Sequence, residues 1–165
     1  MLFRSLSSQP RTELYLSLGA VLAEEGRLEE AGSQYERVLA LDPDNPGAKN
    51  NAAIALYRMG NVAGARQALE AVATDFPGHP DAVNNLAAIA VDSGEWEAAI
   101  RYSERALEID ESITEAWNNM GIARQELGDS EGAAKAYDQA LSLDSEYWPA
   151  WFNLGSSLRS QERFQ

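Results

Sequence analysis

Asparagine recurs in two registers with a spacing of 34 residues, and its amide is the group whose placement most suggests a function. The two registers hold Asn50, Asn84 and Asn118, and Asn51, Asn85, Asn119 and Asn153. Each amide offers one acceptor and two donors, so it can bond the C=O and the N–H of one extended peptide unit. Asparagine is a mediocre residue for a helix interior, because its side chain competes for backbone hydrogen bonds. The recurrence therefore predicts a row of amides that binds a peptide backbone with little regard to its side chains.

A structural role for the same asparagines is the alternative. Their amides could bond neighbouring helices to each other, or cap backbone groups between repeats. The two roles do not exclude each other, and the sequence leaves both open.

Catalytic and metal-binding chemistry finds no support in the chain. There is no cysteine and a single histidine, His79, and no phosphate-binding loop or hydrolase motif is present. The segment from Asp42 to Asn45 lacks the 12-residue ligand spacing and the final Glu of a calcium loop, so we interpret it as a turn. We therefore expect no enzymatic activity, no cofactor and no metal site.

The elements that must position the asparagines follow from an internal repeat. Four glycines and four alanines are each spaced by 34 residues: Gly26, Gly60, Gly94 and Gly128, and Ala31, Ala65, Ala99 and Ala133. Each copy is expected to form a helix A, a turn at the glycine and a helix B. In the first copy these helices are expected near 12–25 and 28–41. The apolar spacing there predicts a core of Leu18, Leu22, Tyr35, Val38 and Leu39, with Gly19 and Ala31 kept small where the two helices cross.

The repeat resembles the tetratricopeptide repeat, whose period is 34 residues. The first copy carries that pattern as Tyr15-x-x-Leu18-Gly19, Ala31, Tyr35 and Pro43, and the fourth as Trp117-x-x-Met120-Gly121, Ala133 and Tyr137. The resemblance implies an all-α fold, a right-handed solenoid with four full repeats (12–45, 46–79, 80–113 and 114–147) and a terminal helix from residue 148. It also implies that the A helices line a concave groove, and that the chain is a non-catalytic protein-interaction module.

The asparagines are also similar to the asparagine ladder in the repeats of O-linked N-acetylglucosamine transferase and kinesin light chain. The ladder register holds Asn51, Asn85, Asn119 and Asn153, whereas the first copy has Ser17 there. By the same pattern, the groove shows six acids and two bases: Glu13, Glu24, Arg58, Asp81, Asp92, Glu115, Glu126 and Arg159. Such a groove favours a neutral or basic peptide and would repel an acidic tail.

Composition adds limits on the partners. The net charge of −13 and a pI near 4.4 are unfavourable for nucleic acid, which is bound through cationic contacts to phosphate. No apolar run is long enough to cross a membrane, and no secretory signal is visible, so we expect a cytoplasmic protein without membrane insertion.

The two ends of the chain carry further expectations. Residues 1–11 are expected to be a frayed extension before a single repeat domain at 12–165. The last helix is rich in aromatic residues, which predicts self-association through the segment Trp148–Phe164 as an alternative function. A further alternative is that the array is the targeting segment of a larger protein.

Overall fold

The computed structural model describes the backbone of residues 2–162 and the side chains of residues 11–157 and 159. This part of the chain is entirely helical, with short turns and no strand. Its helices are α1 (Leu2–Glu24), α2 (Leu28–Leu41), α3 (Pro46–Arg58), α4 (Val62–Asp75), α5 (Pro80–Asp92), α6 (Trp96–Ile109), α7 (Thr114–Glu126), α8 (Ser130–Leu143) and α9 (Trp148–Glu162). The odd-numbered helices are the A helices and the even-numbered ones the B helices.

Glycine sets the turn within each repeat. Gly26, Gly60, Gly94 and Gly128 all have positive φ, between 71° and 87°, which is the left-handed region that costs glycine least. Each of these glycines follows an A helix, and the B helix begins two residues later. The 34-residue spacing of the glycines therefore fixes the period of the whole array.

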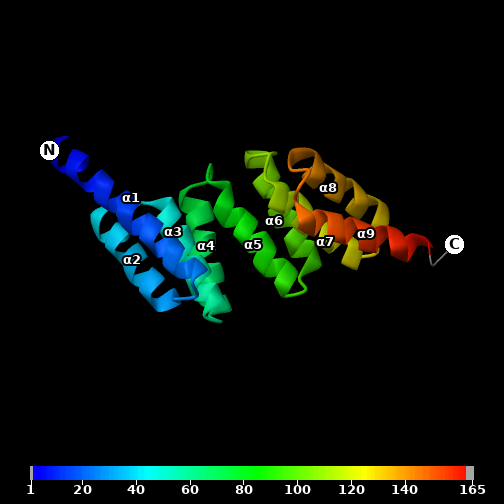
Figure 1. Ribbon diagram of the computed structural model, residues 1–165, viewed down its shortest axis with the longest axis horizontal. Helices are drawn as coiled ribbons and strands as arrows, with labels where there is room; N and C mark the ends of the chain where they lie inside the picture. Colours follow the sequence, from blue (N-terminus) through cyan, green and yellow to red (C-terminus); the bar gives the residue numbers. More distant parts are fainter. Residues whose placement is uncertain (1, 163–165) are drawn as a thin grey trace. The chain divides into compact units, whose positions relative to one another are not determined.

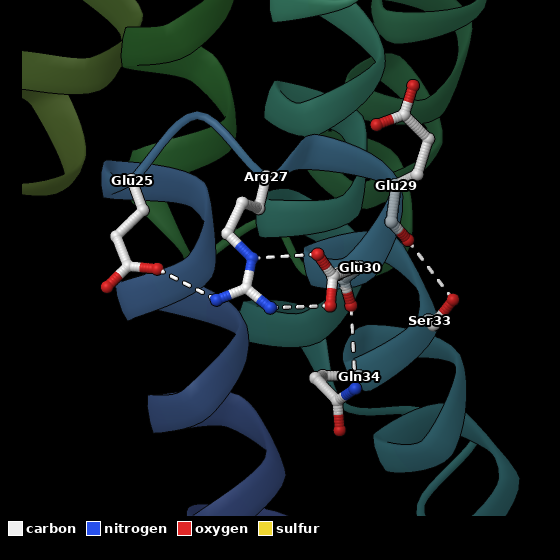
Figure 2. A network of polar contacts seen from close by, with 6 residues as sticks. All are labelled: Glu25, Arg27, Glu29, Glu30, Ser33 and Gln34. Atoms are coloured by element: carbon white, nitrogen blue, oxygen red, sulfur yellow. Dashed lines mark hydrogen bonds and ion pairs between the residues drawn. The ribbon is translucent and has the colours of Figure 1, made fainter.

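The first of these turns also carries a network of charged side chains (Figure 2). The guanidinium of Arg27 donates to both carboxylate oxygens of Glu30, at 2.7 and 2.6 Å, and to Glu25 at 3.1 Å. Arg27 precedes the N-terminus of α2, where a positive charge opposes the helix dipole. The two carboxylates offset this charge, and the hydrogen bond from Arg27 lowers the pKa of Glu30.

The chain divides into two compact units, which are described separately. The first ends at Pro77 and contains α1 to α4, and the second begins at Gly78 and contains α5 to α9. The A helices α1, α3, α5 and α7 each pack against the B helix that follows them, as Figure 1 shows for α1 with α2 and for α7 with α8. Consecutive A helices also touch, namely α1 with α3, α5 with α7, and α7 with α9.

In the first and fourth repeats, the A and B helices approach closely at a glycine, which has no side chain. A Cβ added to Gly19 would overlap the ring of Tyr35, and one added to Gly121 would overlap the ring of Tyr137. Both tyrosines are almost fully buried. Ala31 and Ala133 are fully buried beside them, as expected for a close crossing of helices.

Two expectations about the first repeat need correction. Leu18, expected in the core, is 43% exposed; its equivalent Met120 lies on α7, which packs against α5 and α6 of the preceding repeat, and is 3% exposed. The helix boundary expected at residue 12 is not found, since α1 extends back to Leu2 and includes residues 2–11. Leu22, Tyr35 and Val38 are buried as predicted, and Leu39 is half-buried.

Candidate peptide-binding site

The asparagines lie in the second turn of the A helices, at matching positions in each repeat. Asn50 and Asn51 are in α3 of the first unit; the second unit contributes Asn84 and Asn85 in α5, Asn118 and Asn119 in α7, and Asn153 in α9. Proline at the first helical position starts α3 and α5, because its fixed φ suits the first turn and its missing N–H is not needed there. The repeat thus places the amides at equivalent positions along α3, α5, α7 and α9.

Asparagine side chains bond to each other between consecutive A helices of the second unit. The Nδ2 of Asn119 donates to Oδ1 of Asn84 at 3.4 Å, and the Nδ2 of Asn153 donates to Oδ1 of Asn118 at 3.0 Å. Asn118 and Asn119 are only 6% and 8% exposed. The amides of Asn119 and Asn153 thus have partners within the protein, and the structural alternative gains direct support.

These bonds use only part of each amide's capacity. An Asn side chain has two hydrogens and two acceptor lone pairs, and each amide–amide bond above takes one hydrogen or one lone pair. Asn84, Asn85 and Asn153 are half-buried, so solvent reaches part of each side chain. A peptide could therefore meet the same amides that join the helices.

In the first unit, two of the residues predicted from the sequence line the same hollow. This hollow, of about 170 Å³, is lined by Ala20, Ala23, Tyr35, Asn51, Ile54, Ala55 and Arg58. Asn50 is buried and donates from Nδ2 to Oδ1 of Asn51 at 3.2 Å. Asn51 and Arg58 are thus polar residues in the lining of an otherwise largely apolar depression formed by α1, α2 and α3.

Arg58 already binds a backbone group. Its guanidinium donates to the carbonyl of Ala23 at 2.7 Å, close to the C-terminus of α1. This contact adds a second donor to a carbonyl that already accepts from the N–H of Gly26, and it places a positive charge near the negative end of the helix dipole. Burial raises the pKa of the nearby Tyr35, whereas the charge of Arg58 lowers it by a smaller amount.

The acidic residues predicted for the groove are all at the surface. Asp81, Asp92, Glu115 and Glu126 lie on the A helices of the second unit, and Asp81 is 3.6 Å from Nδ1 of His79. Their charge acts on neighbouring tyrosines: burial, assisted by Glu115, raises the pKa of Tyr147, and burial, assisted by Glu126, raises that of Tyr137. Among the described side chains, no group of three His, Cys, Asp or Glu residues could hold a metal ion.

A larger hollow that the sequence did not predict lies between α6 and α7. It measures about 460 Å³ and is lined by Glu104, Leu107, Glu108, Glu111, Trp117, Met120 and Arg124. The indole of Trp117 is held at its rim by a hydrogen bond to the carbonyl of Glu111 at 3.0 Å. The signal present in the sequence is the pair Glu104 and Glu108, whose spacing puts them on one face of α6; Glu111 follows in the turn beyond that helix.

None of the helices in the described part of the chain has the length and apolar character of a membrane span.

Comparisons with known proteins agree with this architecture. Two models of the tetratricopeptide repeat match residues 22–88 and 79–146. A search of the curated proteins finds no match. Among solved structures, the fold is similar to TTC0263, a thermophilic tetratricopeptide repeat protein of Thermus thermophilus (TM-score 0.80, 21% identity, 92% of this chain and 84% of that one).

Two further solved structures show the same fold. One is residues 41 to the end of MamA from Desulfovibrio magneticus RS-1, with a TM-score of 0.73, 20% identity, and coverage of 92% of this chain and 86% of that one. The other is YrrB, described as a tetratricopeptide repeat protein with an unusual peptide-binding site, with a TM-score of 0.65, 22% identity, and coverage of 90% and 76%. With its 34-residue helix pairs, its glycine turns and these matches, the chain belongs to the tetratricopeptide repeat family.

Proposed function

We propose that this protein is a non-catalytic interaction module that binds an extended neutral or basic peptide across the asparagine-bearing side of its A helices. Protein binding is the general role of this repeat family, and the nature of the ligand is our inference. The observation that carries it is the pairing of amides between successive A helices, Asn84 with Asn119 and Asn118 with Asn153. This pairing brings amides of successive A helices in the second unit close together, so that one extended peptide could contact several of them.

The charge of the surrounding surface supports the choice of ligand. Asp81, Asp92, Glu115 and Glu126 lie at the surface, and Arg58 is already bonded to a backbone carbonyl. The negative charge of these carboxylates would repel an acidic peptide, whereas it would attract lysine or arginine side chains. YrrB, which shares the fold, is described as having a peptide-binding site, and this is consistent with such a role here.

Nuclear magnetic resonance of the asparagine side-chain amides provides the test. The labelled protein is titrated with pools of unstructured peptides composed of Gly, Ala and Lys, and with matched pools in which Glu replaces Lys. We expect the Lys pools to shift the amide signals of Asn84, Asn85, Asn118, Asn119 and Asn153, and the Glu pools to leave them in place.

Asn45 and Asn61 are internal controls. Their side chains accept from backbone N–H groups of Ala48 and Gly64 at helix N-termini of the first unit and take no part in the amide pairing, so their signals should stay unchanged. If only the signals of residues that line the hollow between α6 and α7 shift, while the signals of the paired amides stay in place, the peptide binds in that hollow and the proposal is refuted.

A further inference from the structure

The last described helix, α9, exposes aromatic side chains along one face. Trp148, Trp151 and Phe152 are 72%, 56% and 67% exposed. Together with Gly155 and Arg159, which are also exposed, they follow the spacing i, i+3, i+4, i+7 and i+11 that puts residues on one side of a helix. The opposite side is anchored in the second unit, because Ala150 and Ser157 are fully buried.

The exposed face corresponds to the face that α7 uses to bind its own B helix. In the fourth repeat, Gly121 lies under the ring of Tyr137, and Trp117 packs against the cluster of Ala133 and Tyr137. The residues 34 positions later are Gly155 and Trp151. A Cβ added to Gly155 would meet no atom within 4 Å. In the fourth repeat the equivalent glycine, Gly121, is covered by a tyrosine ring. Among the described residues, none covers Gly155 in this way.

Phe152 indicates that an apolar contact suits this face. It occupies the register of Asn84 and Asn118, whose side-chain oxygens accept hydrogen bonds from the A helix of the following repeat. A phenyl ring cannot accept such a bond, so the polar link between repeats is not offered by α9. Trp151 is held in place by a hydrogen bond from its indole to the carbonyl of Ser145 at 2.9 Å, which fixes one wall of the apolar face.

We propose that this face binds a second copy of the chain, with the two α9 helices packed antiparallel. The face carries both a ring and a glycine surface, three residues apart, so it is complementary to itself, as a two-fold interface requires. With the two-fold axis between Phe152 and Gly155, Phe152 of each copy lies opposite Gly155 of the other. The same register brings Trp148 opposite Arg159, where an indole and a guanidinium attract each other.

The distribution of charge favours dimerisation through the segment that begins at Trp148. The chain has a net charge of −13, so two copies repel each other over most of their surface. From Trp148 onward, however, the sequence has two arginines against one glutamate. The proposal is tested separately from the peptide-binding role, because Phe152 and Gly155 at its centre are not among the residues predicted to bind the peptide.

Sedimentation equilibrium over roughly 5 µM to 1 mM tests the association, since an interface of two helices is small and should be weak. We expect a monomer–dimer equilibrium that strengthens with salt, as screening reduces the repulsion. Gly155→Gln fills the glycine surface with a polar side chain and should weaken dimerisation at least about tenfold. It should not lower the melting temperature, because glutamine is a better helix former than glycine.

Gly32→Gln is the matched control. Gly32 is also within a helix, and a Cβ added there meets no atom within 4 Å, so this change should leave dimerisation unaffected. Equal effects of the two substitutions, or a protein that stays monomeric up to the highest concentration, would overturn the proposal.

Disulfide trapping tests the antiparallel register, because the wild-type chain has no cysteine. A mixture of Trp148→Cys and Arg159→Cys proteins should form the mixed disulfide dimer in preference to either homodimer. In the proposed register each Trp148 would lie roughly 16 Å along the axis from its counterpart, at about 1.5 Å per residue, too far for a direct bond. Equal yields of the three dimers would contradict the register.

A synthetic peptide with the sequence of residues 130–144, which carries the ring of Tyr137, tests whether the exposed face of α9 binds a B-type helix of another protein instead of a second copy of the chain. If the peptide binds α9 while the protein remains monomeric without it, the face belongs to a B-type helix from a partner, and the self-association proposal is wrong.

Discussion

At the scale of single residues, one position on each A helix and one on its B helix decide how closely the two pack. Gly19 and Gly121 lie under tyrosine rings. In the second and third repeats the same positions hold Ala53 with Leu69, and Ala87 with Ser103, all of which are buried. Where the A helix has alanine in place of glycine, the B helix has leucine or serine in place of tyrosine. The ring of a tyrosine therefore requires a glycine opposite it.

Gly121→Ala should consequently destabilise the fold, although alanine normally favours a helix. The added methyl group would overlap Tyr137, and overpacking of this kind costs about 1–3 kcal/mol. Gly32→Ala is the control, since space is open there and it should stabilise by about 0.5–1 kcal/mol. Urea denaturation of both variants measures the difference, and a Gly121→Ala protein as stable as the wild type would contradict the packing argument.

At the scale of helices, side-chain amides join successive A helices of the second unit. The bond between Asn119 and Asn84 connects α7 with α5, and the bond between Asn153 and Asn118 connects α9 with α7. Asn118 and Asn119 are nearly buried, so truncating either member of a pair leaves a polar group with poor access to water. We therefore expect these amide pairs to contribute to the stability of the second unit.

A double-mutant cycle on Asn84 and Asn119 should detect this contribution. Each substitution by alanine should cost on the order of 0.5–1.5 kcal/mol, and the double variant should lose less than the sum. Asn45→Ala combined with Asn119→Ala is the control, because Asn45 caps α3 in the other unit and the two effects should add. A coupling energy of zero between Asn84 and Asn119 would mean that their bond does not stabilise the fold.

The sequence predicts the helices better than it predicts the contacts of the asparagines. Glycine and proline mark helix ends locally, so the second helix of the first repeat was predicted at its observed bounds, Leu28–Leu41. The amide bonds join residues 35 apart, such as Asn84 and Asn119, and therefore link two different registers of a 34-residue repeat. Comparison of equivalent positions does not reveal such a pairing, nor does it reveal that Leu18 is 43% exposed while its equivalent Met120 is buried.

At the scale of the whole molecule, the dominant property is an excess of negative charge. The chain has 26 acidic and 13 basic residues. Ion pairs such as Lys135 with Glu131, at 2.6 Å, lie at the surface, where they contribute little to stability. The folded chain therefore holds many like charges in a smaller volume than the unfolded chain does, which opposes folding in dilute buffer.

Added sodium chloride should accordingly raise the melting temperature. The Debye length falls from about 10 Å at 0.1 M to about 3 Å at 1 M, so repulsion between acidic side chains is progressively screened. Thermal unfolding followed by circular dichroism at a few micromolar protein, where association is negligible, measures this effect. A midpoint that stays constant or falls up to 1 M salt would argue against repulsion as a major cost.

The match between glycine and tyrosine also restricts how such an array can be rearranged by gene duplication and recombination. A crossover in the turn between an A helix and its B helix would exchange partners between repeats. If the A helix that contains Gly19 were joined to the B helix that contains Leu69, a gap would remain opposite the glycine. If the A helix that contains Ala53 were joined to the B helix that contains Tyr35, the methyl group would overlap the ring. A breakpoint in the loop between repeats, such as residues 42–45, keeps each pair together. The heritable unit of this solenoid is thus the matched helix pair, counted from one interrepeat loop to the next.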